Sequence, residues 1–224
     1  MSEQVYSLTT LSDPRARRRI FLDIALRRAQ PGAGSVISLL EQSREGQTWP
    51  DLTSILSGIP WTVVGGVATR TYMPERATQN VDILIAHVHA DQTYARLRAA
   101  GYIDRQNLSI GRTTWQSPGG TLLDVVESRE PWVLEALAQV QTDPQGLPVL
   151  SSPYLALMKV QASRTQDLAD LSRMLGLASA DERQATRRVF SRWHPGALED
   201  LESLISLGEL EIAAGDGHSA ENTS

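Results

Sequence analysis

The chain has 224 residues, which at roughly 150 residues per domain allows one full domain with a second small one or with long flanks. Hydrophobic residues make up 41% of the sequence, enough for a core, and the formal net charge of -5 excludes a disordered polyanion and a dedicated nucleic-acid coat. The absence of cysteine excludes disulfide scaffolds, zinc fingers, iron–sulfur sites and thiol nucleophiles.

The first predicted element is a basic amphipathic helix over residues 13–30. Asp13-Pro14 is typical of a helix start, and Pro31-Gly32 ends the pattern. Six arginines against two aspartates give this segment a charge of +4. The helix either approaches RNA phosphates or a membrane surface, or presents a solvated arginine-rich face. Its predicted apolar stripe consists of Ile20, Phe21, Ile24 and Ala25.

Two further short helices, over residues 35–44 and 51–56, complete an N-terminal helical segment that spans residues 1–57. Between residues 58 and 130 strands and helices alternate, which indicates an α/β core. The predicted helices of this core are 67–73 and 90–100, and the predicted strands are 61–64, 81–85, 109–115 and 121–126, the last two joined in a hairpin by Ser-Pro-Gly-Gly.

Residues 131–214 form a predicted C-terminal helical region, and residues 215–224, which lack an apolar period, are expected to be disordered. The predicted fold class is therefore α/β, or α+β, with a small mixed β-sheet and both N-terminal and C-terminal helices. No stretch approaches the about 18 consecutive apolar residues of a membrane span, and no signal pattern opens the chain, so we expect a cytoplasmic protein. The predicted helices of the C-terminal region are 132–139, 153–163, 166–175, 181–193 and 197–213.

The most informative stretch begins where the predicted strand 61–64 runs into Gly65-Gly66. Two glycines between a strand and a helix suit a phosphate chain, because free backbone N–H groups lie there and glycine permits close approach of the backbone. The sequence therefore predicts a phosphate-binding turn at Gly65 and Gly66.

Two oxygen-bearing side chains follow in the next predicted strand. Asn80 and Asp82 are two residues apart, so in a strand they project from the same face, with Val81 on the opposite, buried face. Asp124, in a later strand that could neighbour this one, supplies a third candidate ligand. Oxygen clusters of this kind bind Mg²⁺ together with substrate phosphates.

These residues carry a resemblance. A strand, Gly-Gly, a helix, an Arg-x-Thr-x-Asn-x-Asp run from Arg76 through Thr78 to Asp82, and a later aspartate resemble the signature of the nucleotidyltransferase superfamily with the DNA polymerase beta fold. Within it the AbiEii-like and minimal nucleotidyltransferases look closest. A downstream match, similar to the helical pattern that follows the catalytic core in AbiEii-like proteins, extends the resemblance over residues 58–176 and consists of Lys159, Arg164, Asp167 and Asp170.

The resemblance implies a role for each matching residue. Gly65 and Gly66 would hold the nucleotide phosphates, while Arg76 and Thr78 would brace the turn before the acidic strand. Lys159, the only lysine in the chain, would contact the triphosphate or another substrate. The implied metal ligands and catalytic residues are Asn80, Asp82 and Asp124, and the implied charge pairs or cleft residues are Arg164, Asp167 and Asp170.

Asn80 stands where the family carries its first metal-binding aspartate. An amide oxygen can bind Mg²⁺ but brings no charge, so two metal ions about 3.5–4 Å apart would need another carboxylate, for which Glu127 is nearest in the sequence. Three explanations stay open: a natural pseudoenzyme, an active enzyme with a changed metal site, or a deliberate Asp→Asn substitution.

The resulting hypothesis is a transfer of a nucleoside monophosphate from an NTP, with Mg²⁺ or Mn²⁺, to a hydroxyl of RNA (tRNA) or protein. The AbiEii-like resemblance adds a toxin–antitoxin setting and a cognate antitoxin protein as a partner. The alternative is a catalytically impaired module that binds a nucleotide or a partner protein, which Asn80 favours.

Structural explanations stand beside these functional ones. The cluster at Lys159 is also typical of a salt-bridged helix surface, and Asp124 of a solvated strand residue. His87 and His89 have a spacing that can bind a metal, yet surface residues at a strand end account for them more simply.

Overall fold

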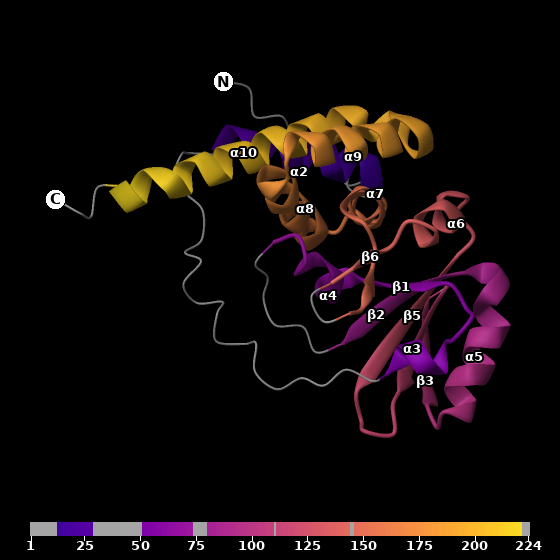
Figure 1. Ribbon diagram of the computed structural model, residues 1–224. Helices are drawn as coiled ribbons and strands as arrows, with labels where there is room; N and C mark the ends of the chain where they lie inside the picture. Colours follow the sequence, from indigo (N-terminus) through magenta and orange to yellow (C-terminus); the bar gives the residue numbers. More distant parts are fainter. Residues whose placement is uncertain (1–12, 29–50, 74–79, 110, 144–145, 221–224) are drawn as a thin grey trace. The chain divides into compact units, whose positions relative to one another are not determined.

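The computed structural model describes residues 13–28, 51–73, 80–109, 111–143 and 146–220 (Figure 1). Its contacts divide the chain into two compact units. The sheet unit is Ile37–Ser151, and the helical unit combines Met1–Val36 with Ser152–Ser224. The predicted helix over residues 35–44 lies outside the described residues, as do Arg76 and Thr78.

One mixed sheet forms the centre of the sheet unit. Among the described residues seven strands take part, in the order β3-β4-β5-β2-β1-β7-β6. The pairs β2–β5 and β1–β7 are parallel, and the other neighbours are antiparallel, so the predicted mixed α/β sheet is confirmed. The strands are β1 (Trp61–Val64), β2 (Val81–Ala86), β3 (Ile103–Ser109), β4 (Arg112–Gln116), β5 (Leu122–Ser128), β6 (Gln141–Thr142) and β7 (Pro148–Val149).

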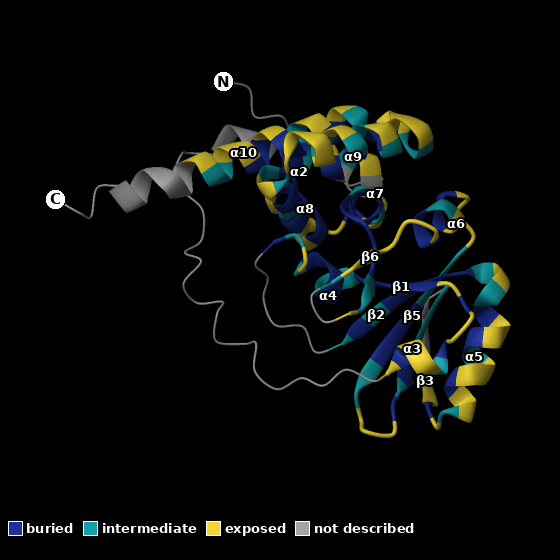
Figure 2. Cartoon of the chain, in the orientation of Figure 1, coloured by how far each residue is buried: buried dark blue, intermediate teal, exposed yellow. Residues whose placement is uncertain are grey.

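The inner strands are apolar because they are covered on both faces. Every residue of β1 is buried, and in β2 only Asp82 is half-buried (Figure 2). This burial agrees with the β-branched and apolar residues that make up most of β1 and β2. The helices of this unit are α3 (Leu52–Ile55), α4 (Gly65–Thr69), the 3₁₀ turn η3 (His87–His89), α5 (Ala90–Ala99) and α6 (Trp132–Leu137).

Three strands were missed, and one predicted strand was too long. The predicted strand 109–115 combines the last residue of β3 with β4, because Gly111, with φ of 82°, turns the chain between them. β3 has the polar sequence of an outer strand, which gives no apolar alternation. β6 and β7 have two residues each, too few for a periodic pattern.

The contacts of residues 131–151 explain why the unit boundary differs from the predicted boundary at residue 130. This segment returns to the sheet: β7 pairs with β1 through Val63 and Val149, and the amide N–H of Leu150 donates to the Val63 carbonyl at 3.0 Å. The predicted extents 1–57, 58–130 and 131–214 stay predictions.

The helical unit consists of packed helices. α8 and α10 approach closely at glycines: a Cβ at Gly208 would lie 2.0 Å from the Ser172 carbonyl oxygen. α10 is longer than the predicted helix 197–213 and extends to Ala220, since residues 214–220 contain no proline that would end it. No helix in the described part of the chain is long and apolar enough to cross a bilayer. The helices are α2 (Pro14–Arg28), α7 (Ser152–Ala162), α8 (Thr165–Leu177), α9 (Ala180–Trp193), the 3₁₀ turn η4 (Pro195–Ala197) and α10 (Leu198–Ala220).

Candidate functional site

Asp82 and Asp124 lie side by side in the sheet. β2 and β5 are parallel neighbours, and these two residues are Cα partners in their register. The structure therefore brings together the two carboxylates that the sequence analysis singled out, here called the acidic pair. Their side chains are 16% and 4% exposed, respectively.

Two residues of β4 hold the acidic pair. Thr114 is opposite Asp124 in the antiparallel register, and its hydroxyl donates to Asp124 Oδ1 at 2.5 Å. Arg112, two residues earlier on the same face, donates from Nη2 to Asp82 Oδ1 and to Asp124 Oδ2, both at 2.7 Å. Arg112 and Thr114 were not predicted from the sequence. Their two-residue alternation indicates a shared strand face, but only the register of β4 with β5 determines what that face contacts.

Gly65 borders the acidic pair at the end of β1. Val64 is the register partner of Asp82, and Gly65 follows with φ of 63°, a conformation that favours glycine. A Cβ at Gly65 would lie 2.3 Å from Asp82 Oδ2. The close approach of this carboxylate thus accounts for Gly65, while the role of Gly65 and Gly66 toward nucleotide phosphates stays a prediction.

Asn80 lies directly before β2 and is half-buried. It is two residues from Asp82, as the predicted ligand pattern requires, and its role as a ligand stays a prediction. The residues proposed to brace the preceding turn, Arg76 and Thr78, lie outside the described residues.

Glu127 does not join the acidic pair. It is three residues beyond Asp124 in β5, so its side chain lies on the opposite face of the sheet. There its Oε2 accepts a hydrogen bond from the Tyr94 hydroxyl at 2.9 Å, and its Oε1 contacts His87 Nδ1. Burial, together with the neighbouring Glu127, raises the pKa of Tyr94. The further carboxylate needed for a second metal ion is therefore not Glu127.

No group of three or more histidines and carboxylates that could hold a metal ion occurs within the described ranges. This applies to His87 and His89, which lie in η3 rather than in a strand. Among the predicted ligands, the two carboxylates of the acidic pair are those that the described structure brings together.

Lys159, predicted to contact the triphosphate, lies in the helical unit in a buried ion network. Its Nζ is 3.1 Å from Asp170 Oδ2 and 3.8 Å from Asp167 Oδ1, and the residue is 6% exposed. Asp167 also accepts from Arg164 Nε at 2.6 Å. The predicted helices 153–163 and 166–175 correspond to α7 and α8, which are separate helices. Lys159 and Asp170 meet because α7 and α8 pack together.

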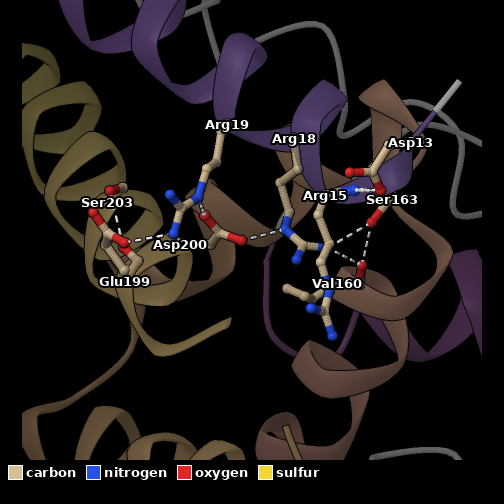
Figure 3. Close-up of polar contacts among 9 residues, drawn as sticks. All are labelled: Asp13, Arg15, Arg18, Arg19, Val160, Ser163, Glu199, Asp200 and Ser203. Carbon is tan, nitrogen blue, oxygen red and sulfur yellow. Dashed lines mark hydrogen bonds and ion pairs between the residues drawn. The ribbon is translucent and has the colours of Figure 1, made fainter. Parts of the chain in front are cut away.

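A second buried ion pair of the helical unit joins Arg18 of α2 to α10. Arg18 Nε is 2.6 Å from Asp200 Oδ2, and Nη1 donates to the Val160 carbonyl and the Ser163 hydroxyl (Figure 3). Arg18 and Leu22, four residues apart, are buried, whereas Ile20 and Phe21 of the predicted stripe are half-buried. One arginine of this basic helix therefore faces inward together with Leu22, and neither residue is part of the predicted stripe.

Comparisons with known proteins found no matching family model and no matching curated protein. Among solved structures, the solution structure of the antibiotic-resistance factor ANT(2'')-Ia is 13% identical, with a TM-score of 0.40, over 76% of this chain and 94% of that chain. A crystal structure of ANT(2'')-Ia in complex with adenylyl-2''-tobramycin is 15% identical, with a TM-score of 0.39, over 69% and 92%. At these identities the two neighbours assign no function to the chain.

Proposed function

We propose that the chain binds a nucleoside triphosphate at the acidic pair and transfers its nucleoside monophosphate to a hydroxyl, which loses its proton, with release of pyrophosphate. The single observation that carries the proposal is the register of Asp82 with Asp124 on adjacent parallel strands, with Gly65 against Asp82. Two carboxylates next to a turn that excludes a side chain are suited to a polyphosphate with its cation.

The donor set fits one hard cation. Mg²⁺ is commonly held by one or two carboxylates plus substrate phosphates, and Asp82 and Asp124 meet that requirement, with the Asn80 amide oxygen as a neutral third donor. Glu127, the further carboxylate considered for a second ion, lies on the other face of the sheet, and no third carboxylate or histidine joins the acidic pair among the described residues. When bound, the cation would offset the negative charge that develops on the phosphates during transfer.

The chain's own residues would orient the reactants. The hydroxyl of Thr114 holds Asp124 Oδ1, which fixes the direction of the carboxylate proposed to accept the proton of the attacking hydroxyl. Asp82, held against Gly65, would keep its second oxygen close to the glycine turn where the phosphates are predicted to bind. Positioning of this kind is the main contribution that a protein makes to phosphoryl transfer.

The acceptor follows from the sequence resemblance alone. The resemblance to AbiEii-like proteins implies that the acceptor is RNA, such as tRNA, or a protein. It also implies that this chain is a toxin, which a cognate antitoxin protein neutralises. Lys159 and Arg164 are part of the same predicted pattern, and their proposed contact with the nucleotide competes with their ion pairs to Asp167 and Asp170.

Incubation with labelled NTPs, Mg²⁺ or Mn²⁺ and total RNA tests the proposal. We expect transfer that falls at least about 100-fold in Asp82→Ala and in Asp124→Ala, a loss in the range seen when one electrostatic group is removed from an active site. Asp104→Ala, an exposed carboxylate on β3, is the matched control and should leave transfer unchanged. Transfer that survives Asp82→Ala would contradict the proposal.

The second candidate is a nucleotide-binding module without transfer activity. Asn80 at the first ligand position and the ion pairs of Arg112 with both carboxylates favour it. It predicts nucleotide-dependent stabilisation of about 2.7 kcal/mol at 100 times the dissociation constant, with transfer appearing only in Asn80→Asp or in no variant. A melting temperature that no nucleotide raises would contradict both candidates.

A further inference from the structure

We propose that Arg112 is the resident counter-ion of the acidic pair and competes with a divalent cation for the same carboxylate oxygens. Metal binding then requires the guanidinium to leave. The inference takes from the proposed function only the position of the cation at Asp82 and Asp124, and it holds whether or not transfer occurs.

The oxygens that Arg112 contacts are those that a cation would need. Its Nη2 lies 2.7 Å from Asp82 Oδ1 and 2.7 Å from Asp124 Oδ2, while Asp124 Oδ1 is bonded to Thr114. A Mg²⁺ ion held by the acidic pair would lie about 2.0–2.1 Å from its carboxylate oxygens, closer than Nη2 does, so the ion and the guanidinium would compete for the same oxygens. Repulsion between the two positive charges adds to this competition.

The guanidinium of Arg112 is held in a way that allows a metal cation to replace it at the two carboxylates. A single nitrogen bridges both carboxylates, instead of the two parallel bonds of a bidentate arginine pair. Arg112 Nε is buried without a hydrogen-bond partner in the described structure, so the guanidinium is not held from its other side by that atom. The side chain is 32% exposed, so water and ions reach it.

The electrostatic balance also favours exchange once a cation is supplied. Two carboxylates carry a charge of -2, of which one guanidinium compensates half. A divalent ion compensates the whole charge, and arginine, displaced but still on the neighbouring strand β4, becomes available to a phosphate group. Arg112 is thus a positioning residue that keeps the two carboxylates together until a metal replaces it.

Titration of the full chain with Mn²⁺, without nucleotide, tests the competition. Arg112→Met keeps the apolar stem and removes the charge, and we expect it to bind Mn²⁺ at least about tenfold more tightly than the unsubstituted chain, a change of about 1.4 kcal/mol. Adding Asp82→Asn to Arg112→Met should abolish the gain. Arg105→Met, at an exposed arginine of β3 bonded to the neutral Gln116, is the matched control and should change nothing. Weaker or equal Mn²⁺ binding by Arg112→Met would overturn the inference.

A measurement on the unsubstituted chain keeps the test independent of how well the variants fold. Phenylglyoxal modifies free guanidinium groups, and peptide mass spectrometry reports the rate at each arginine. Mn²⁺ should accelerate modification of Arg112 and leave Arg105 unchanged; a rate at Arg112 that Mn²⁺ does not raise overturns the inference. Failure of the proposed function looks different: metal competes with Arg112 as expected, but neither nucleotide binding nor transfer is detected.

Discussion

Each of the two units of this protein holds two neighbouring carboxylates with one cationic side chain between them, but the exposure of that cation differs. In the sheet unit, Arg112 lies between Asp82 and Asp124; in the helical unit, Lys159 lies between Asp167 and Asp170. The cation is 32% exposed in the first case and 7% exposed in the second. A cationic side chain that is exposed to water can be displaced by another cation. A cationic side chain that is buried between helices stabilises the fold, because its loss would leave buried carboxylates unpaired.

The difference arises from where the charges lie in each fold. The acidic pair lies near the start of two strands, next to a glycine turn, and its arginine extends from a hairpin strand. The lysine network lies where α7 and α8 pack, so its carboxylates are desolvated, and desolvated charges are tolerated only when paired. The comparison separates a candidate reactive site from a structural network made of similar residues.

The largest expected effect is the loss of the buried cation. Lys159→Met leaves Asp167 and Asp170 without their lysine and should lower the free energy of unfolding by about 3–5 kcal/mol, measured by urea denaturation. Arg164→Ala removes a side chain that is 69% exposed and should cost at most about 1 kcal/mol. A Lys159→Met protein as stable as the unsubstituted chain would break the comparison and return Lys159 to the candidate substrate contacts.

Glycine substitutions give the next largest effect and sharpen the comparison at the acidic pair. Gly65→Ala combines a left-handed backbone with a contact of 2.3 Å to Asp82 Oδ2, so we expect a loss of about 2–4 kcal/mol. Gly58→Ala has a similar φ, 79°, but no atom within 4 Å of the added Cβ, so it should lose about 1–2 kcal/mol. Equal losses in the two variants, measured by thermal and urea denaturation, would show that Asp82 moves away without cost.

Strand alternation made the acidic pair predictable from the sequence, whereas its ion-pair partner Arg112 was not predictable. The two-residue spacing of Asn80 and Asp82 around the apolar Val81, and the apolar strand around Asp124, can be recognised in the sequence because each is a local pattern. Arg112 could not be assigned, because its contacts depend on the register of β4 against β5 and of β5 against β2, which no local pattern gives.

In the helical unit, too, ion pairs could not be predicted from the sequence, because they join residues that are far apart along the chain. The helices α2, α7, α8 and α9 were predicted within two residues of their observed bounds. The burial of Arg18, however, depends on Asp200, 182 residues away in sequence. A helix with six arginines in its segment has no local signal for which of them faces inward. Local periodicity identified the elements, and only the packing of distant elements determined which charges meet.

Removal of the exchangeable cation should have an intermediate effect on stability that metal reverses. Arg112→Met removes two charged hydrogen bonds and should lower the free energy of unfolding by about 1–3 kcal/mol in the presence of a chelator. Added Mg²⁺ should restore part of that loss, because the ion binds the folded acidic pair. Lys159→Met, measured in parallel by the melting temperature, should gain nothing from Mg²⁺. Equal responses of the two variants to Mg²⁺ would remove the distinction between the two networks.

The smallest expected effect comes from an exposed ion pair, Arg187 with Glu202, in which two parallel hydrogen bonds of 2.7 and 2.8 Å join the guanidinium to the carboxylate. The hydrogen bond from Arg187 holds the pKa of Glu202 below its ordinary value of 4.5. Because the folded pKa is lowered, the stabilisation is complete above the ordinary value and disappears as the pH falls through the lowered one. Since the two side chains are 34% and 50% exposed, Arg187→Ala should cost at most about 1 kcal/mol at neutral pH and nothing in acid, measured by urea denaturation across pH. A stability difference between Arg187→Ala and the unsubstituted chain that does not change with pH would mean that this exposed ion pair adds no stability despite its good geometry. Burial would then be what distinguishes the lysine network from the exposed ion pairs.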